Sequence, residues 1–437
     1  MTDHLDLHVS RTSVPDAGDQ HWAFFCDAVF APGDFQQRPR DKVPPIIRRN
    51  SDHWATTVED MAQQFYFLTA PAAVVRKRLL IQGYSYLYVQ DVWEQLREAH
   101  VGRWRKFRGK GDKQLELTAT LSYQDWLALI RQHEKDSHFA SVDGSSHWQS
   151  PLALLSQPRD ILVRLAILCE ALESAQVWLD CGFLYKDALE TRTPHAIAQA
   201  EAGAPDEDPT GKIIVLTEGK SDSRIISRAL RALYPEFADA YQFIDFEGFR
   251  IEGGASVLAR MVKILAGARV QNRLLAIFDN DAAGMEAKAS LGGVRFGPAV
   301  RLMALPDTPL ATRYPTIGPD GLKTMNINGS GVGIELFLGR SSLRRGRTLQ
   351  PVRWTQWNEK VQRYHGAIDD KSGAAEAFLT GIADGRRPAR LRRAYPEMTM
   401  LLESIFGAFE DYPPSMAAID DWQIRDKGAD SETLENL

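Results

Sequence analysis

The sequence predicts an α/β protein of several domains, with a parallel sheet at its centre. The chain has 437 residues, more than one ordinary hydrophobic core organises, so two or three domains are expected. Residues 199–211, QAEAGAPDEDPTG, combine two prolines, two glycines and four acids, a composition typical of a linker. From residue 213 to 305, apolar β-branched runs alternate with helical patterns, which predicts right-handed βαβ units.

Before the linker, residues 1–198 are expected to form a mainly helical domain with a short β-rich start. Short apolar runs broken by Pro and Gly, such as residues 22–25, favour strands, and from about residue 56 the period becomes helical. Ser122 is placed to cap one of the helices. The predicted helices cover residues 72–82, 89–99, 123–131 and 158–180.

After the linker, residues 212–340 are expected to form the central domain. The predicted strands are 213–217, 241–246, 273–278 and 299–305, and the predicted helices are 222–233, 255–266 and 282–289. Residues 306–333 are rich in Gly, Pro and Thr and are typical of a long loop. Residues 341–437 are predicted to be a helical region with a frayed tail.

Composition narrows the class of protein. No run of 18 uncharged apolar residues occurs and the first residues lack an apolar core, so neither a membrane span nor a signal peptide is expected. Three cysteines without a CxxC pair disfavour a disulfide scaffold or a zinc site and favour the cytoplasm. The net charge of −5 does not by itself favour nucleic-acid binding, which would need local basic patches.

Acidic side chains follow two of the predicted strands. Glu218 follows the first strand, and Asp279 and Asp281 follow the third, with Asp222 in the first turn of a helix. The carboxyl ends of parallel strands meet at one edge, and Asp279 and Asp281 point to the same side of an extended backbone. Carboxylates suit Mg²⁺ or Mn²⁺, and two ions would stabilise a phosphoryl displacement. The alternative is a pair of solvated turns, which the matching strand ends make less attractive.

The segments IIVLTEGKSDSRII (213–226) and LLAIFDNDAAG (274–284) resemble the Toprim domain of topoisomerases, primases and related nucleases. The resemblance implies a Rossmann-like parallel sheet and Mg²⁺-dependent phosphodiester chemistry. It implies metal binding or acid–base work for Glu218 and Mg²⁺ binding for Asp279 and Asp281.

The spacing from Glu218 to Asp222 is similar to that of the overcoming-lysogenisation-defect nucleases, which also use a later acid and a lysine. The best matches here are Glu335, in VGIELFLG, and Lys371, in YHGAIDDKSG. Resemblance thus gives a metal set of Glu218, Asp222, Asp279, Asp281 and Glu335, with Lys371 catalytic. The open alternatives are an ordinary helix start for Glu335 and a surface position for Lys371.

The regions flanking the central domain resemble HEPN/Toprim-associated proteins, which take part in bacterial defence against phage. The segment PAAVVRKRLLIQGYSYLYVQDVWEQL (71–96) carries this likeness, and the chain has no P-loop. HEPN ribonucleases use an R-x(4–6)-H pattern, which Arg131 with His138 and Arg48 with His53 match. Two such matches are what chance provides, so ordinary surface residues are the simpler interpretation.

Basic residues offer contacts to phosphates. Candidates are Lys220 and the run containing Arg386, Arg387 and Arg390, although a solvated helix face is the commoner explanation for such a run. A second basic segment, 103–113, is expected to be a loop.

Together these features predict a cytoplasmic Mg²⁺- or Mn²⁺-dependent nuclease with two ions, with DNA favoured over RNA as its substrate. The N-terminal domain is expected to mediate homo-oligomerisation or bind a partner protein. Two alternatives remain open: a sensor or nucleic-acid-binding subunit with a non-catalytic Toprim, and a HEPN ribonuclease with Toprim as an accessory.

Overall fold

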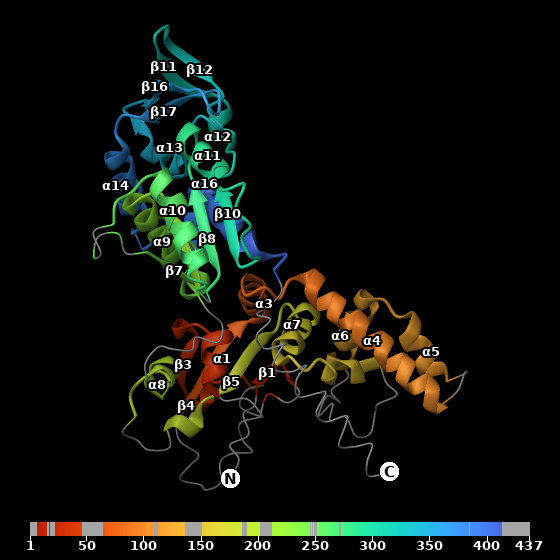
Figure 1. Cartoon of the computed structure of the whole chain (residues 1–437). Coiled ribbons are helices and arrows are strands. Elements are labelled where there is room, and N and C mark those ends of the chain that lie inside the picture. The colour runs from red at the N-terminus through yellow and green to blue at the C-terminus, as the bar shows by residue number, and fades with distance from the viewer. Residues whose placement is uncertain are drawn as a thin grey trace. The chain divides into compact units, whose positions relative to one another are not determined.

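The protein divides into two compact units, residues 1–210 with 410–437 and residues 211–409. The computed structural model (Figure 1) describes residues 7–14, 17, 22–45, 64–108, 112–135, 151–185, 190–201, 212–244, 246, 248, 251–270, 272–383 and 385–412. Within these residues, no helix has both the length and the apolar character needed to cross a membrane.

The first unit contains an antiparallel sheet of five strands in the order β2-β1-β5-β4-β3. Its strands are β1 (Leu7–Val9), β2 (Thr12–Ser13), β3 (Phe35–Pro39), β4 (Gln64–Pro71) and β5 (Gln176–Asp180). Its helices are α1 (Trp22–Ala28), α3 (Ala72–Ile81), α4 (Tyr86–Arg108), α5 (Lys113–Thr120), α6 (Tyr123–Lys135), α7 (Ile161–Ala171) and α8 (Pro194–Glu201).

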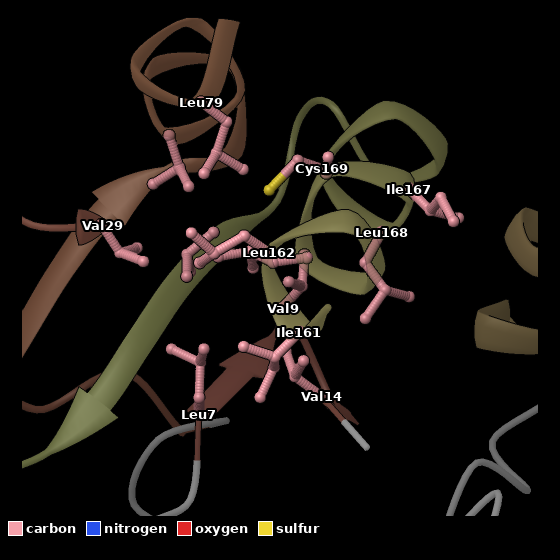
Figure 2. Close-up of a cluster of buried hydrophobic side chains, with 14 of the residues drawn as sticks. Leu7, Val9, Val14, Val29, Leu79, Ile161, Leu162, Ile167, Leu168 and Cys169 are labelled. Atoms are coloured by element: carbon pink, nitrogen blue, oxygen red, sulfur yellow. The ribbon is translucent and has the colours of Figure 1, made fainter. Parts of the chain in front are cut away.

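The core of this unit lies between the sheet and helices α3 and α7. Helix α7 is apolar nearly all round, as expected of a helix buried on every side. Figure 2 shows Leu7 and Val9 of β1 close to Ile161 and Leu162 of α7, and all four side chains are buried. Asp160 caps α7 by accepting a hydrogen bond from the Leu162 N–H at 2.9 Å.

Several predictions for this unit are confirmed. Helix α3 ends at Ile81, and Gly83 follows with a positive φ of 102°. Helix α6 begins at Tyr123, and the Asp125 N–H donates to Ser122 Oγ at 3.1 Å, as expected of a capping serine.

Other predictions for this unit are wrong. The predicted helix 158–180 ends at Ala171 and is followed by β5, whose Val177, Trp178 and Leu179 are all buried, so its apolar run shows no strand periodicity. Residues 22–25 lie in α1, where Trp22, Phe25 and Cys26 share a buried face at helical spacing. Strand β4 falls inside the stretch expected to be helical, and the sheet gives the unit more strand than expected. Helix α4 runs on through Arg108, so basic residues 103–108 are helical rather than a loop.

The second unit is built on a parallel sheet, as predicted, and its strand order is β10-β8-β6-β7. Its strands are β6 (Ile213–Thr217), β7 (Tyr241–Phe243), β8 (Leu274–Phe278) and β10 (Val300–Ala304). The helices between them are α9 (Lys220–Leu233), α10 (Ala255–Gly267) and α11 (Ala282–Ala289). Each matches its predicted range to within a few residues.

Helices cover both faces of this sheet. On one face, Leu216, Ala276 and Phe278 pack with Leu258 and Val262 of α10. On the other lies α9, against which three later helices pack: α14 (Lys371–Ile382), α15 (Pro388–Ala394) and α16 (Pro396–Phe406). The strands are therefore buried on both faces, which explains their continuous apolar sequences.

The segment expected to be a long loop contains regular structure. Its elements are α12 (Pro309–Thr312), β11 (Tyr314–Gly318), β12 (Gly321–Met325) and β13 (Gly331–Val332). The hairpin β11–β12 turns at Gly321, whose φ is +87°, and its second strand is exposed throughout, so its composition is that of a loop.

The region expected to be helical after residue 340 begins with strands. Helix α13 (Gly339–Ser342) precedes the small hairpin β14 (Arg344–Arg345) and β15 (Thr348–Leu349). Strands β16 (Val352–Asn358) and β17 (Arg363–Ile368) then join the earlier hairpin in a sheet ordered β12-β11-β16-β17. Only residues 371–406 follow the helical prediction, as α14 to α16.

Candidate metal centre

The site begins where β6 and β8 end side by side. Thr217 and Ile277 are partners in the parallel register, so Glu218 and Asp279 leave the same edge of the sheet. The chain passes from β6 to β7 on one side and returns to β8 on the other, which makes this edge the topological switch point. The Asp279 N–H donates a hydrogen bond to Glu218 Oε1 at 2.9 Å, linking the two strand ends directly.

Asp281 is fixed by two neighbours. It belongs to the short strand β9 (Asn280–Asp281) and caps helix α11, accepting a hydrogen bond from the Gly284 N–H through Oδ1 at 2.8 Å. Its other oxygen, Oδ2, lies 3.2 Å from His365 Nδ1, without the alignment of a good hydrogen bond. Sequence reasoning missed His365, because nothing within strand β17 indicates that it folds back onto β9.

Glu335 reaches the site through a pairing far apart in sequence. Strand β13 pairs antiparallel with β9, with Gly331 opposite Asp281, and the chain then enters a short 3-10 turn, Ile334–Phe337. A Cβ placed on Gly333 would lie 2.6 Å from Glu335 Oε2 and 3.4 Å from Asp279 Oδ2. The two carboxylates therefore border the same glycine, and Glu335 is buried.

Lys371 provides the positive charge of the cluster. It is the first residue of α14, which Asp370 caps by accepting a hydrogen bond from the Gly373 N–H at 2.9 Å. Its Nζ lies 3.2 Å from Glu335 Oε1. The structure thus brings Lys371 to Glu335, although 35 residues that include four strands separate them in sequence.

Asp222 completes the acidic set from the first turn of α9. Its Oδ1 accepts a hydrogen bond from Ser221 Oγ at 3.2 Å. Burial, and after it the nearby negative charge of Glu335, raise the pKa of Asp222 to about 6. All six residues proposed for metal binding or catalysis therefore fall within electrostatic reach of one another.

Three glycines let the backbone approach Glu218. The Gly254 N–H donates to the Glu218 carbonyl oxygen, and a Cβ on Gly253 would lie 2.9 Å from that oxygen. A Cβ on Gly284 would lie 2.8 Å from Glu218 Oε1. These contacts are closer than side chains tolerate, so the glycines set the width of the site.

The cluster strongly disfavours full ionisation. Burial raises the pKa of Glu218 to about 7, with a smaller contribution from the charges of Asp281 and Asp222. The hydrogen bond from the Asp279 N–H acts in the opposite direction. Burial followed by the charge of Glu218 raises the pKa of Asp279 well above its usual range. Burial acts to lower the pKa of Lys371, but Glu335 and the other acids together raise it. A divalent cation would relieve this repulsion.

The donor set suits a hard cation, because it consists of carboxylate oxygens without cysteine. As the side chains stand, however, no three His, Cys, Asp or Glu residues among those described are gathered closely enough to hold a metal ion. Rotation of the carboxylates toward a common point would be needed to ligate one.

The basic residues proposed for phosphate contacts are distributed unevenly. Lys220 is exposed at the start of α9, beside the acids. In the arginine run, Arg386, Arg387 and Arg390 are exposed, but Arg392 donates to the Leu233 carbonyl at the far end of α9. A helix of 14 residues spans about 20 Å, so the structure does not bring this run to the acids.

A different basic group, which sequence reasoning missed, lies nearer. The β14–β15 hairpin carries Arg344, Arg345 and Arg347 around Gly346, and Arg345 Nη2 lies 2.8 Å from Asp370 Oδ2, next to Lys371. Its signal in the sequence is the run RRGR, whose glycine permits a tight turn. In the structure that glycine, Gly346, has a positive φ of 61°.

Most residues of the HEPN-type pattern lie outside the part of the chain that the structure describes. Arg131 is exposed on α6, while His138, Arg48 and His53 lie outside the residues that the structure describes. Comparison with family models, with curated proteins and with solved structures finds no match to this chain.

Proposed function

We propose that this protein is a divalent-metal-dependent nuclease whose catalytic centre is the acidic cluster of the second unit. One observation carries the proposal: Glu218 and Asp279 meet at the switch point of a parallel sheet, with Asp222, Asp281 and Glu335 around them. Clusters of perturbed titratable groups at such an edge are typical of functional sites. The resemblance of residues 213–226 and 274–284 to Toprim domains supports the same activity.

The five acids would hold Mg²⁺ or Mn²⁺, with two ions accommodated by a set of this size. Bound divalent cations supply Lewis-acid stabilisation of charge on the phosphodiester and favour deprotonation of water. Glu218 and Asp279 come from rigid strand ends, whereas Asp222 and Glu335 come from helical turns. That division leaves the second pair free to adjust to the ions.

Two further side chains support these ligands. Lys371 Nζ, beside Glu335, is positioned to balance the acids and to stabilise negative charge on a phosphoryl group. His365 lies against the outer oxygen of Asp281, a contact that would hold the carboxylate in one orientation.

The broader role follows from resemblance. Likeness to HEPN/Toprim-associated proteins supports a role in bacterial defence against phage and a partner-binding or self-associating first unit. DNA is the favoured substrate, and the three cysteines without a CxxC pair favour a cytoplasmic location.

A second candidate is a metal-binding sensor or nucleic-acid-binding subunit without turnover. The favouring observation is that no three acids among the described residues are gathered for coordination as they stand.

A cleavage panel separates the two candidates. Purified full-length protein is incubated with supercoiled plasmid, linear duplex, single-stranded DNA and RNA in Mg²⁺, Mn²⁺ or EDTA, beside an Asp279→Ala, Asp281→Ala double variant. Metal-dependent cutting that the double variant loses is the expected result. Metal binding without cutting of any substrate supports the second candidate. RNA cutting in EDTA places the activity in the first unit.

A further inference from the structure

The small sheet beside the acidic cluster exposes an unusual group of apolar side chains. Among the described residues, nine large hydrophobic side chains are exposed, and four of them lie on strands β12, β16 and β17. Trp357 and Tyr364 are 49% and 52% exposed and are direct register partners on one face of the β16–β17 hairpin. Their ring centroids lie 5.0 Å apart, and Trp354 is 6.3 Å from Tyr364 on the same face.

The same part of the chain is basic. Residues 313–371 contain ten Lys and Arg against five Asp and Glu, a surplus of positive charge in a chain whose net charge is −5. Some of these charges are used internally, as in the Arg353–Asp369 pair at 3.0 Å. Arg344 and Arg347 in the β14–β15 hairpin are exposed and form no ion pair with any residue of the described ranges. A polyanion therefore fits this region better than an apolar protein surface does.

Hydrogen bonds join the β16–β17 hairpin to segments next to the acidic cluster. Asn358 Nδ2 donates to Glu286 Oε2 of α11 at 2.7 Å, and Arg363 Nη1 donates to the Gly329 carbonyl at 2.9 Å. His365, the neighbour of Tyr364, lies against Asp281. Neighbouring residues of a strand point to opposite faces, so the aromatic face and the acids lie on opposite sides of β17. Because β17 is an edge strand, a ligand that reaches from the aromatic face to the acids has to pass around one strand only, a distance of about 5–10 Å.

We propose that the exposed face of the β16–β17 hairpin is a stacking platform for single-stranded nucleic acid. Trp357 and Tyr364 would each stack a base, and Arg344 and Arg347 would contact the phosphates that follow. Unpaired bases offer free π-faces to aromatic side chains, whereas the bases of an intact duplex stack on one another. The inference deepens the proposed nuclease function, because it makes a single strand the substrate class that reaches the acids.

Binding is tested separately from cleavage. Fluorescence anisotropy measures the Kd of full-length protein for a labelled 20-nucleotide oligothymidine and for a 20-base-pair duplex, with Ca²⁺ in place of Mg²⁺. We expect the single strand to bind more tightly than the duplex. Trp357→Ala and Tyr364→Ala should each weaken single-strand binding by about 5- to 150-fold, the range that loss of one stacked base produces, and leave duplex binding unchanged. Leu322→Ala, at a 70% exposed position of the same sheet, should change neither.

Salt dependence tests the arginines. In the Arg344→Ala, Arg347→Ala double variant, the slope of log Kd against log salt concentration should fall by about 1.4, or about 0.7 for each lost contact to a single strand. An unchanged slope would overturn the assignment of these arginines to phosphate contacts.

Two results overturn the platform: wild-type affinity in both aromatic variants, or tighter binding of duplex than of single strand. If cleavage still requires Asp279 in those cases, the platform alone is wrong and the nuclease proposal stands. If the aromatic variants lose single-strand binding but no metal supports cleavage, the platform stands and the nuclease proposal fails. Retained oligothymidine binding with altered pull-down of a protein would show a protein surface instead, and also overturns the platform.

Discussion

At the scale of single residues, the candidate site is defined by carboxylates that repel one another. Asp279 is central, because its backbone N–H binds Glu218 while its side chain adjoins Glu335 across Gly333. Such an arrangement is unfavourable in the absence of a cation, which supports the proposal that the cluster binds one.

The first prediction concerns Asp279→Asn, which removes one charge at nearly constant volume. Cleavage should fall by about 10²- to 10⁴-fold, the loss of several kcal/mol of metal-based stabilisation. Thermal unfolding in EDTA at pH 8 should occur at the same or a higher temperature, because a repulsion is relieved. A gel-based cleavage assay and a melting curve check both expectations. Cleavage at the wild-type rate would show that Asp279 is not a ligand.

His365 gives a second residue-scale prediction. Its contact with Asp281 raises the pKa of His365 above its usual value, although burial of the ring acts to lower that pKa. Removing the ring in His365→Ala should lower Mn²⁺ affinity or cleavage by about 10- to 100-fold, as for groups that orient metal ligands, without abolishing either. His133→Ala, at a partly buried position of α6 in the first unit, serves as the control. Complete loss of Mn²⁺ binding would make His365 a ligand, and no loss would remove it from the site.

At the scale of elements, the pairing of β13 with β9 brings Glu335 to the switch point. The position of the Glu335 carboxylate there depends on Gly333, because a Cβ on Gly333 would lie 2.6 Å from Glu335 Oε2. Many residues separate β9 from β13 in the sequence. The two residue pairs between these strands and the 3-10 turn that follows β13 position Glu335.

The third prediction follows from that geometry. Gly333→Ala should displace Glu335 and lower Mn²⁺ affinity by about tenfold, with a melting temperature close to that of the wild type. Gly293→Ala is the matched control, since a Cβ at Gly293 has no atom within 4 Å. Equal Mn²⁺ titration curves for the two variants would show that Glu335 does not contribute to metal binding.

Sequence reasoning was most accurate where each element carries its own signal. Strands β6 and β8 are continuous apolar runs that end in acids, and α9 follows with clear amphipathicity, so their positions and the acids Glu218 and Asp279 were predictable. Strand β5 was missed because it is buried on both faces, and β12 because it is exposed on both.

At the scale of the whole molecule, the limit of prediction was long-range contact. Glu335 and Lys371 were proposed through resemblance alone, and only the fold shows that Lys371 reaches Glu335. The β16–β17 hairpin, with Trp357 and Tyr364, was expected to be helical, because most of its residues are exposed or half-buried and its sequence shows no clear alternation of apolar and polar residues.

The acidic cluster also makes a prediction for global stability. In the metal-free protein the pKa of Glu218 is raised to about 7 from an ordinary 4.5, so the folded state binds its proton more tightly than the unfolded state does. Its stabilising contribution is therefore complete below pH 4.5 and is lost as the pH rises through 7. The raised pKa of His365 acts in the same direction near neutral pH.

The fourth prediction follows from that linkage. The unfolding transition of the second unit in EDTA should move to lower temperature between pH 5.5 and pH 8, and Mn²⁺ should raise it more at pH 8 than at pH 5.5. Differential scanning calorimetry measures both shifts, with Asp279→Asn as the variant in which each should shrink. A Mn²⁺ effect that is larger at pH 5.5 would contradict the proposed ligands.

Binding of divalent ions by the acidic cluster is the most direct test of the proposed metal centre. Free Mn²⁺ is counted by electron paramagnetic resonance during titration into full-length protein at pH 8, and into the Asp279→Asn, Asp281→Asn double variant. We expect two bound ions per chain in the wild-type protein, with both lost or greatly weakened in the double variant. Equal binding by the two proteins, or no binding by the wild-type chain at millimolar Mn²⁺, would contradict the proposed metal centre.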